Sequence, residues 1–200
     1  MTRNREIIHL VASLLVLTIA FTYPSLNPEM MLVVAFGVGT GFLLHELAHK
    51  FTAQKYGYEA DYEANPVGLL LALGLSIITN GGFVFAAPGA VMIRSRKVFY
   101  SPLEERYWDS LRSAKELAYI SVSGAVVNLI LALLFFTASF FAPAGMAYAL
   151  LRTGAVINVF LAGFNMIPFG PLDGAKVWKY NPVLWGIVGI PAIILFLVIS

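Results

Sequence analysis

Long uncharged runs alternate with short polar stretches along this chain. Residues 30–44 carry no charge, and a helix that starts there is expected to continue to about residue 56. Other apolar runs are long enough to cross a bilayer, namely residues 7–22, 117–141, 146–167 and 182–199. The pattern predicts an all-α polytopic membrane protein with about five to six transmembrane helices.

The stretch between the second and third of these helices has a different pattern. Residues 56–66 are polar with tyrosines at alternate positions, which favours a short strand at the membrane interface. Residues 67–79 are apolar but too few for a comfortable crossing. After the turn at Asn80-Gly81-Gly82, residues 83–93 have a strand-like composition. We therefore predict a small membrane-embedded β-hairpin or re-entrant element, with a single full crossing as the alternative.

The distribution of charge supports this topology. Only 12% of the residues are charged, against about a quarter in a typical soluble domain, and residues 94–115 form the one strongly charged stretch. If the N-terminus is cytoplasmic and residues 67–93 return to their own side, all thirteen Lys and Arg except Arg152 are cytoplasmic. The positive-inside rule expects this arrangement. We therefore expect a multi-pass protein of the cell membrane with its N-terminus in the cytoplasm.

The composition also excludes several classes of site and partner. Because the chain has no cysteine, it has neither disulfides nor thiolate ligands, and any metal must be held by His, Asp, Glu or Asn. The sequence contains no basic stripe of the kind that indicates nucleic-acid binding. The first apolar run ends at Tyr23-Pro24 without a small-residue cleavage site, so we do not expect a removable signal peptide.

Two of the three histidines, His45 and His49, lie four residues apart with Glu46 between them. On a helix they share one face, a turn apart, and are near enough to bind one metal ion. In this H-E-x-x-H pattern the histidines bind zinc and the glutamate is the base for a bound water. Ionisable groups inside an apolar helix are expensive and rarely without function, which favours a metal site.

A catalytic zinc usually has three protein ligands and one open position. Apart from Glu46, Asp173 is the acid closest to the end of an apolar helix at matching depth and on the same side. The proline-rich turn before it is stiff rather than helical, which suits a carboxylate that points inward. The alternative is that Asp173 only pairs with Lys176 in a surface turn.

The motif H-E-L-A-H at residues 45–49, followed by N-x-x-P-x-x-P-L-D-G at residues 165–174, resembles the site-2 protease family of intramembrane zinc metalloproteases. The resemblance implies that residues 1–200 form a single membrane-embedded metalloprotease domain, a minimal catalytic core. It implies one zinc per chain, with Asp173 as the third ligand beside the two histidines, Glu46 as the base and Asn165 as a stabiliser of the oxyanion. The substrates would be transmembrane segments of other proteins, cleaved in the bilayer near its cytoplasmic face.

Two positions depart from the usual family pattern. Gly170 stands where a second proline is common, and Ala125 replaces a proline in the middle helix that carries Gly124 and Asn128.

A substrate helix must unwind before cleavage, and the predicted hairpin would receive the unwound strand by edge pairing. Other residues are expected to line a water path or to let a second helix approach: Ser121, Ser123 and Asn128 for the path, and Gly37, Gly39 and Gly41 for the approach.

Two other functions remain open from the sequence. One is a membrane metal transporter or sensor that uses the histidines as a transit site. The other is a different H-E-x-x-H membrane metalloprotease, in which Glu104, Glu105 or Glu116 supplies the third ligand. The sequence leaves the oligomeric state open.

Overall fold

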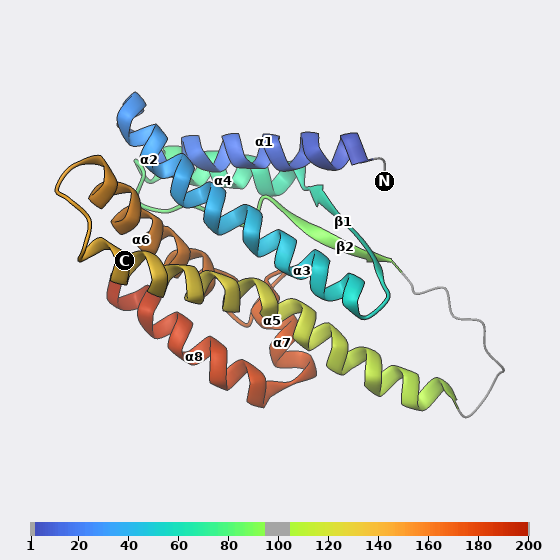
Figure 1. Cartoon of the computed structure of the whole chain (residues 1–200). Coiled ribbons are helices and arrows are strands. Elements are labelled where there is room, and N and C mark those ends of the chain that lie inside the picture. The colour runs from blue at the N-terminus through green and yellow to red at the C-terminus, as the bar shows by residue number, and fades with distance from the viewer. Residues whose placement is uncertain (1–2, 95–104, 200) are drawn as a thin grey trace.

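A computed structural model describes residues 3–94 and 105–199 of the chain. Figure 1 shows long helices packed along one another, with a small sheet beside the N-terminal helix. The prediction of a mostly helical polytopic membrane protein is confirmed. The elements are α1 (Arg3–Thr22), α2 (Pro28–Val38), α3 (Leu44–Lys55), β1 (Glu59–Ala64), α4 (Pro66–Ile78), β2 (Gly89–Arg94), α5 (Glu105–Ser139), α6 (Met146–Asn165), α7 (Asp173–Tyr180) and α8 (Pro182–Ile199).

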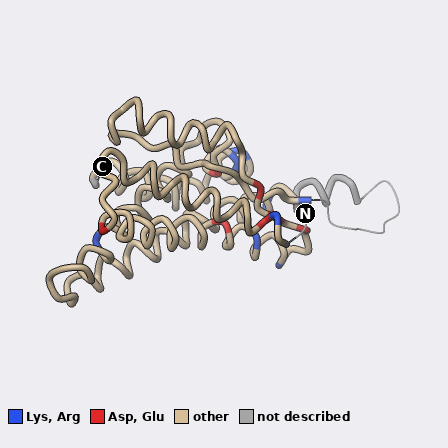
Figure 2. Tube along the Cα trace, turned by 90° about the horizontal axis from the view of Figure 1, so that it is seen from above, with Lys and Arg blue, Asp and Glu red and all other residues tan. Residues whose placement is uncertain are grey.

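Four helical stretches in the described residues are long and apolar enough to cross a membrane. They are Asn4–Thr22, Pro28–Lys55, Ser113–Ser139 and Met146–Asn165, and the apolar helices α4 and α8 are shorter. Figure 2 shows most of the charged residues gathered at the end of the molecule where the N-terminus lies. The predicted count of about five to six spans stays a prediction, because it depends on the short helices.

The histidine-bearing span is one continuous helical rod with an unexpected feature. Between α2 and α3 the residues Gly39–Leu43 form a π-helical segment. On this rod, a Cβ at Gly37 would lie 2.7 Å from Cδ1 of Ile157, and a Cβ at Gly41 would lie 2.7 Å from Cδ1 of Leu161. Both glycines therefore let α6 approach closely, as predicted. A Cβ at Gly39 would lie 3.9 Å from Cδ1 of Leu14 on α1, an ordinary contact distance, so close approach does not require a glycine there.

The two strands pair in antiparallel register, from Glu59 opposite Arg94 to Ala64 opposite Gly89. This pairing joins the two ends of the intervening segment, which must return to the side of the bilayer that it left. Helix α4 leads the chain away from β1, and residues 83–88 lead it back to β2 without regular secondary structure. Thirteen helical residues and six extended residues each span roughly 20 Å, so the two arms match in length.

The pairing of β1 with β2 supports the re-entrant prediction over a single full crossing, and the path of this segment relative to the bilayer stays a prediction. The predicted hairpin within residues 83–93 is wrong in its pairing, because β2 takes β1 as its partner across α4. Residues 83–88 cannot supply that partner, because they pack as an irregular segment. Phe85, for example, lies edge-on against Phe164 of α6, with ring centroids 5.5 Å apart.

Helix α1 covers the outer edge of β1. The backbone N–H of Tyr62 donates to Oε1 of Glu6 at 3.1 Å, and that of Ala64 donates to Nδ1 of His9 at 3.2 Å. Ser13, on the same face of α1, is hydrogen-bonded to the Tyr62 hydroxyl at 2.8 Å. The edge of β1 that faces away from β2 is therefore occupied by side chains of this chain.

The outer edge of β2 has no strand partner among the described residues. The N–H of Asn65 donates to the carbonyl of Pro88 at 2.8 Å, which makes these two residues a hydrogen-bonded pair. Bonded and non-bonded pairs alternate along an antiparallel ladder. Val91 and Ile93 consequently direct their backbone N–H and C=O groups away from β1, toward the open edge.

The C-terminal helices differ from the sequence prediction in two places. Helix α5 begins at Glu105 rather than near residue 117, so the charged stretch is partly helical, and residues 95–104 lie outside the described residues. Asp173 is not in a turn: it is the first residue of the short helix α7. Gly170 has a φ of +63°, a value closed to proline, which explains the glycine at this position.

Candidate metal centre

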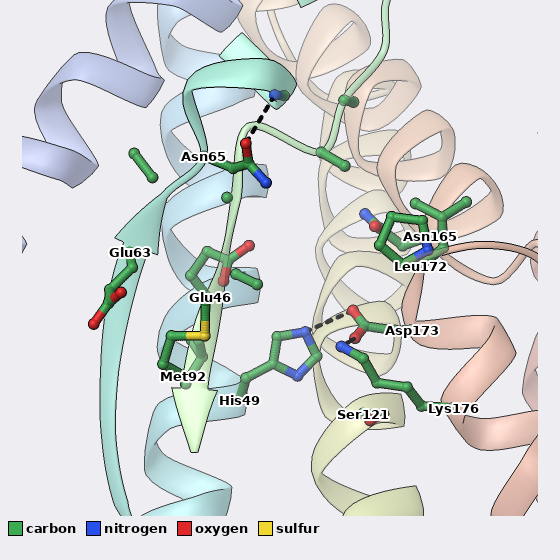
Figure 3. Close-up of a pocket in the computed structure, with 18 of the residues that line it drawn as sticks. Glu46, His49, Glu63, Asn65, Met92, Ser121, Asn165, Leu172, Asp173 and Lys176 are labelled. Atoms are coloured by element: carbon green, nitrogen blue, oxygen red, sulfur yellow. Dashed lines mark hydrogen bonds and ion pairs between the residues drawn. The ribbon is translucent and has the colours of Figure 1, made fainter. Parts of the chain in front are cut away.

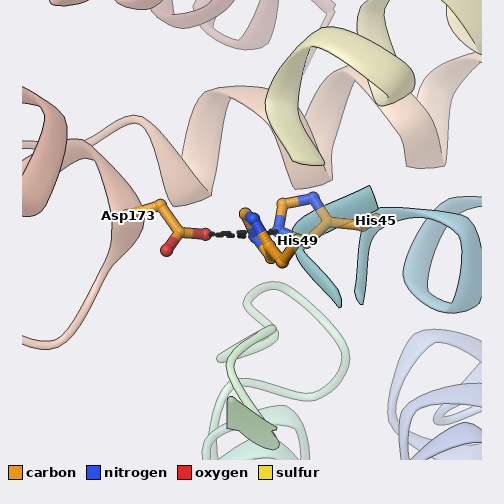
Figure 4. A group of neighbouring side chains, drawn as sticks. All are labelled: His45, His49 and Asp173. Carbon is orange, nitrogen blue, oxygen red and sulfur yellow. Dashed lines mark hydrogen bonds and ion pairs between the residues drawn. The ribbon is translucent and has the colours of Figure 1, made fainter. Parts of the chain in front are cut away.

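Three side chains that are distant in sequence meet at one point beside α3 (Figure 4). His45 and His49 are buried, and their Nε2 atoms lie 2.9 Å apart. Oδ2 of Asp173 lies 2.9 Å from Nε2 of His49 and 3.3 Å from Nε2 of His45. The structure therefore brings together the three residues that the sequence suggested as metal ligands.

The geometry of this group fits a zinc ion. Ligand atoms around a tetrahedral zinc, each at about 2.0–2.2 Å from the ion, are separated by roughly 3.3–3.6 Å. The observed triangle, with edges of 2.9, 2.9 and 3.3 Å, is slightly tighter than this range. Two imidazole nitrogens and one carboxylate oxygen are a donor set that zinc accepts.

The second ring nitrogen of His49 supports this assignment. Its Nδ1–H donates to the backbone carbonyl of Ile120 on α5 at 2.7 Å. A proton on Nδ1 leaves Nε2 unprotonated and directed at the centre of the group, as metal binding requires. The hydroxyl of Ser123 also donates to the same carbonyl, at 2.7 Å.

The His45 ring packs flat against the backbone of α5 at Gly124. A Cβ at this position would lie 2.6 Å from both Cε1 and Nε2 of the imidazole. Any side chain there would collide with a ligand atom of the group. Gly124 thus makes room for the metal centre, a role that the sequence did not reveal.

The carboxylate of Asp173 serves two partners. Oδ2 faces the histidines, while Oδ1 accepts a hydrogen bond from Nζ of Lys176 at 3.1 Å. The pairing with Lys176 that was the alternative prediction thus coexists with the histidine contacts, and the Asp173 side chain is only 12% exposed. Burial alone would raise its pKa, but the charge of His49 when its imidazole is protonated, the contacts of Oδ2 with both imidazoles, and Lys176 hold the pKa of Asp173 well below its usual range. The carboxylate therefore stays ionised at neutral pH and available as a ligand.

A cavity of about 800 Å³ opens beside this group (Figure 3). Glu46 and Asn165 both line it, together with Ser121. Oε2 of Glu46 has no hydrogen-bond partner among the described residues, although the side chain is buried. One N–H of the Asn165 amide donates to the carbonyl of Leu161 at 3.0 Å. The two residues predicted to be catalytic therefore share one cavity with His49 and Asp173.

Strand β2 forms another wall of the same cavity. Residues 89–93 line it, and Figure 3 shows β2 between β1 and the His49 side chain. The open strand edge thus faces the candidate metal centre. Of the residues predicted to line a water path, Ser121 does so, whereas Ser123 and Asn128 do not line this cavity.

The alternative glutamate ligands find no support in the described residues. Glu116 accepts a hydrogen bond from the Tyr58 hydroxyl at 2.8 Å and is not part of the histidine group. Glu104 and the side chain of Glu105 lie outside the described structure.

Comparison with known proteins agrees with this geometry. The model of peptidase family M50 matches residues 33–149, more than half of the chain. The chain belongs to peptidase family M50. This match confirms the resemblance to the site-2 protease family, and it contains both histidines and Glu46.

This M50 chain has relatives among curated proteins. It is 39% identical over 191 residues to MJ0611 of Methanocaldococcus jannaschii, provisionally named a zinc metalloprotease, covering 95% of this chain and 92% of the relative. It is 31% identical over 171 residues to YwhC of Bacillus subtilis, named in the same provisional way, covering 78% and 70%. It is 28% identical over 138 residues to zinc metalloprotease MJ0392 of Methanocaldococcus jannaschii, covering 68% of this chain and 30% of the relative. No solved structure matches this M50 chain significantly.

Proposed function

We propose that this M50 chain is an intramembrane zinc metalloprotease that hydrolyses peptide bonds within or near transmembrane segments of membrane proteins. The observation that carries the proposal is the meeting of His45, His49 and Asp173 beside Glu46, in a cavity walled by an open strand edge. The zinc metalloprotease names of its relatives support the same reaction.

His45, His49 and Asp173 would hold one zinc ion per chain. When bound, zinc supplies Lewis acidity, which acidifies a water molecule and polarises a peptide carbonyl. The carbonyl of Ile120 holds His49 in the tautomer that leaves Nε2 free for the metal. Lys176 orients the Asp173 carboxylate by binding the oxygen that the histidines do not use.

Glu46 is the proton carrier in this mechanism. Its carboxylate lies at the cavity beside His49, and one of its oxygens is free of protein hydrogen bonds. It accepts the proton of the attacking water and then delivers it to the nitrogen of the leaving amine. A carboxylate already bound to a neighbouring donor would be a weaker base, so the free oxygen suits this role.

Asn165 is proposed to stabilise the oxyanion that develops on the attacked carbonyl. A side-chain amide has two N–H donors, and only one of them is bound to Leu161. Because Asn165 lines the cavity, the other donor is proposed to face it. A preorganised donor in a site sheltered from water stabilises negative charge more strongly than it would in bulk solvent.

The open edge of β2 is proposed to bind the substrate. A transmembrane helix hides its carbonyls in internal hydrogen bonds, so the cleaved segment must first unwind. The outward N–H and C=O groups of Val91 and Ile93 can then pair with the unwound segment as an added strand. This holds the scissile carbonyl in extended form beside the candidate metal centre and favours substrates with helix-breaking residues.

We also propose the orientation of the protein in the cell membrane. Within the described residues most of the charged residues gather at the end where the N-terminus lies (Figure 2), and β1 and β2 lie at that same end (Figure 1). The gathering of Lys and Arg at that end supports a cytoplasmic location for it and for the N-terminus. Cleavage would then occur near the cytoplasmic face of the bilayer.

Metal analysis tests the ligand set. Purified wild-type protein is expected to contain one zinc per chain, and Asp173→Ala is expected to contain far less. Lys176→Ala is the matched control, because it removes a partner of the same carboxylate but no ligand, so its zinc content should stay close to one. Full zinc occupancy in Asp173→Ala would assign the third ligand to another residue.

Substitution of the base tests the reaction. Glu46→Gln is expected to fold and to keep its zinc, because Gln has the same size and no ligand is lost. Its cleavage of a membrane-anchored substrate with a Gly- or Pro-weakened helix should fall by about 10²–10⁴, the usual effect of losing a positioned general base. The assay compares both proteins in liposomes, with a rigid poly-Leu substrate as the uncut control.

Two outcomes of this assay would contradict the proposal. Equal cleavage by wild type and Glu46→Gln would exclude Glu46 as the base. Zinc movement across liposomes by a wild type that cuts no substrate would favour a transporter instead.

A further inference from the structure

Two asparagines are buried in the apolar interior and do not line the cavity. Asn128 of α5 and Asn158 of α6 are both 0% exposed. Neither polar atom of the Asn128 amide has a hydrogen-bond partner among the described residues, and neither does Oδ1 of Asn158. Buried amides are nearly always hydrogen-bonded, so two unpaired amides in one protein interior call for a reason.

The geometry of α5 places Asn128 one helical turn beyond the residue that contacts the His45 ring. Gly124 contacts the His45 ring, and Asn128 follows one helical turn later on the same face. Because α5 runs antiparallel to the histidine helix, that turn lies at the level of Gly41, just before His45 in the chain.

Asn158 reaches the same level from α6. Its Nδ2 and Oδ1 atoms each lie 3.4 Å from the position that a Cβ on Gly41 would take. One of its N–H groups donates to the carbonyl of Gly154 at 2.8 Å, which fixes the amide and leaves Oδ1 unpaired. Two amides from neighbouring helices therefore meet the turn that precedes His45.

His45 lacks the outer hydrogen bond that His49 has. Its Nε2 faces the metal group, but its Nδ1 is buried without a hydrogen-bond partner in the described structure. A histidine that ligates through Nε2 carries its proton on Nδ1, and it nearly always donates that proton to an acceptor. The two amides supply acceptors at this level.

We propose that Asn128 and Asn158 hold a water molecule against Nδ1 of His45, and that this water orients His45 as a metal ligand. The water accepts the Nδ1–H and donates to the two amide oxygens, which gives it three polar partners, a usual number for a buried water. Asn128 and Asn158 are positioning residues in this assignment, which rests on the metal centre of the proposed function.

The proposal predicts that one substitution changes zinc affinity without lowering the stability of the fold. Leucine in place of either asparagine removes the amide and its water together and leaves no polar atom of that side chain unpaired, a change that can be nearly neutral for a fold. Removing the outer partner of a ligating histidine lowers metal affinity by roughly 10–100-fold. Leucine at either position is therefore expected to weaken zinc binding without weakening the fold.

The experiment measures two quantities on full-length protein in detergent. Zinc affinity comes from competition with a chelating dye, and the melting temperature is taken after removal of the metal. Asn128→Leu and Asn158→Leu should each bind zinc roughly 10–100-fold more weakly, with the metal-free melting temperature unchanged or raised. Asn128→Ser keeps a hydroxyl and leaves space for water, so its affinity should stay within a few-fold of wild type.

Ser76→Ala is the matched control, because Ser76 is a buried polar residue of α4 whose hydroxyl donates to the carbonyl of Ala20 at 2.7 Å. It should lower the melting temperature and leave zinc affinity unchanged. Wild-type affinity in both leucine variants would overturn the water assignment and leave the metal centre intact. So would a parallel fall of affinity and melting temperature, which marks a packing defect. A wild type that binds no zinc would overturn the metal centre as well.

Discussion

Gly124 shows how a residue without a side chain shapes the metal centre. The His45 imidazole occupies the volume that any β-carbon on Gly124 would need. The collision involves ligand atoms rather than the far end of a flexible chain, so it cannot be relieved without moving a ligand. The effect of a substitution here should therefore appear in metal binding before it appears in folding.

We predict that Gly124→Ala binds zinc at least tenfold more weakly than wild type, because the ring of His45 must shift. Gly74→Ala is the control, since it also adds one methyl to a helix but has no atom within 4 Å of the new carbon. It should leave zinc affinity unchanged, and alanine should favour the helix by up to about 1 kcal/mol. A competition titration with a chelator measures both variants, and equal affinities would remove Gly124 from the metal centre.

At the scale of single residues, the sequence was informative where a motif indicates a metal site. His45, His49 and Glu46 follow from spacing, and Asp173 follows from depth and charge. The roles of Ile120 and Gly124 could not be found in this way, because they depend on contact with a helix about seventy to eighty residues away. The role of a backbone carbonyl or of a space without a side chain cannot be recognised from residue type, because it exists only once the helices are packed.

Among the elements, the two-stranded sheet has unequal edges. Side chains of α1 cover the edge of β1, while the edge of β2 faces the cavity. Strand tendency was visible in the sequence for both segments. Their pairing was not, because register across an intervening helix depends on packing against α1 and α3 rather than on local composition.

We predict that Val91→Pro impairs substrate binding and spares the sheet. The N–H of Val91 faces away from β1, so proline removes a donor from the open edge without breaking the ladder. Loss of one hydrogen bond of about 0.5–1.5 kcal/mol corresponds to a fall in kcat/KM of roughly 2- to 13-fold.

Val91→Ala keeps the donor and trims the same side chain, so it should cleave faster than Val91→Pro. Initial rates in liposomes, with zinc content and melting temperature checked for each variant, make the comparison. Equal rates for the proline and alanine variants would mean that the substrate does not pair at this edge.

Over the whole molecule, charge placement and strand pairing are consistent with one topology. The return of residues 67–93 to their own side was inferred from the distribution of Lys and Arg, and the pairing of β1 with β2 requires it. The short helix α7 and the early start of α5 were missed. Both contain charged residues, which composition assigned to loops.

The proposed orientation predicts a labelling pattern. Because the chain has no cysteine, single cysteines can be placed without background. Glu63→Cys and Lys179→Cys should react with a membrane-impermeant thiol reagent only from the cytoplasmic side, and Ala144→Cys only from the opposite side. Reaction of positions 63 and 179 from different sides would exclude this topology. Reaction of all three in the reversed sense would invert the orientation but keep the fold.

The π-helical segment Gly39–Leu43 also fixes how far α3 is rotated about the helix axis relative to α2. A π turn contains one more residue than an α turn, and each residue of an α-helix turns the chain by about 100°. Gly37 before the segment is fitted to α6, while His45 and His49 after it are fitted to α5 and α7. A chain shortened by one residue here would keep every motif and still point its histidines away from Asp173. Within this span, therefore, the number of residues carries as much information as their identity.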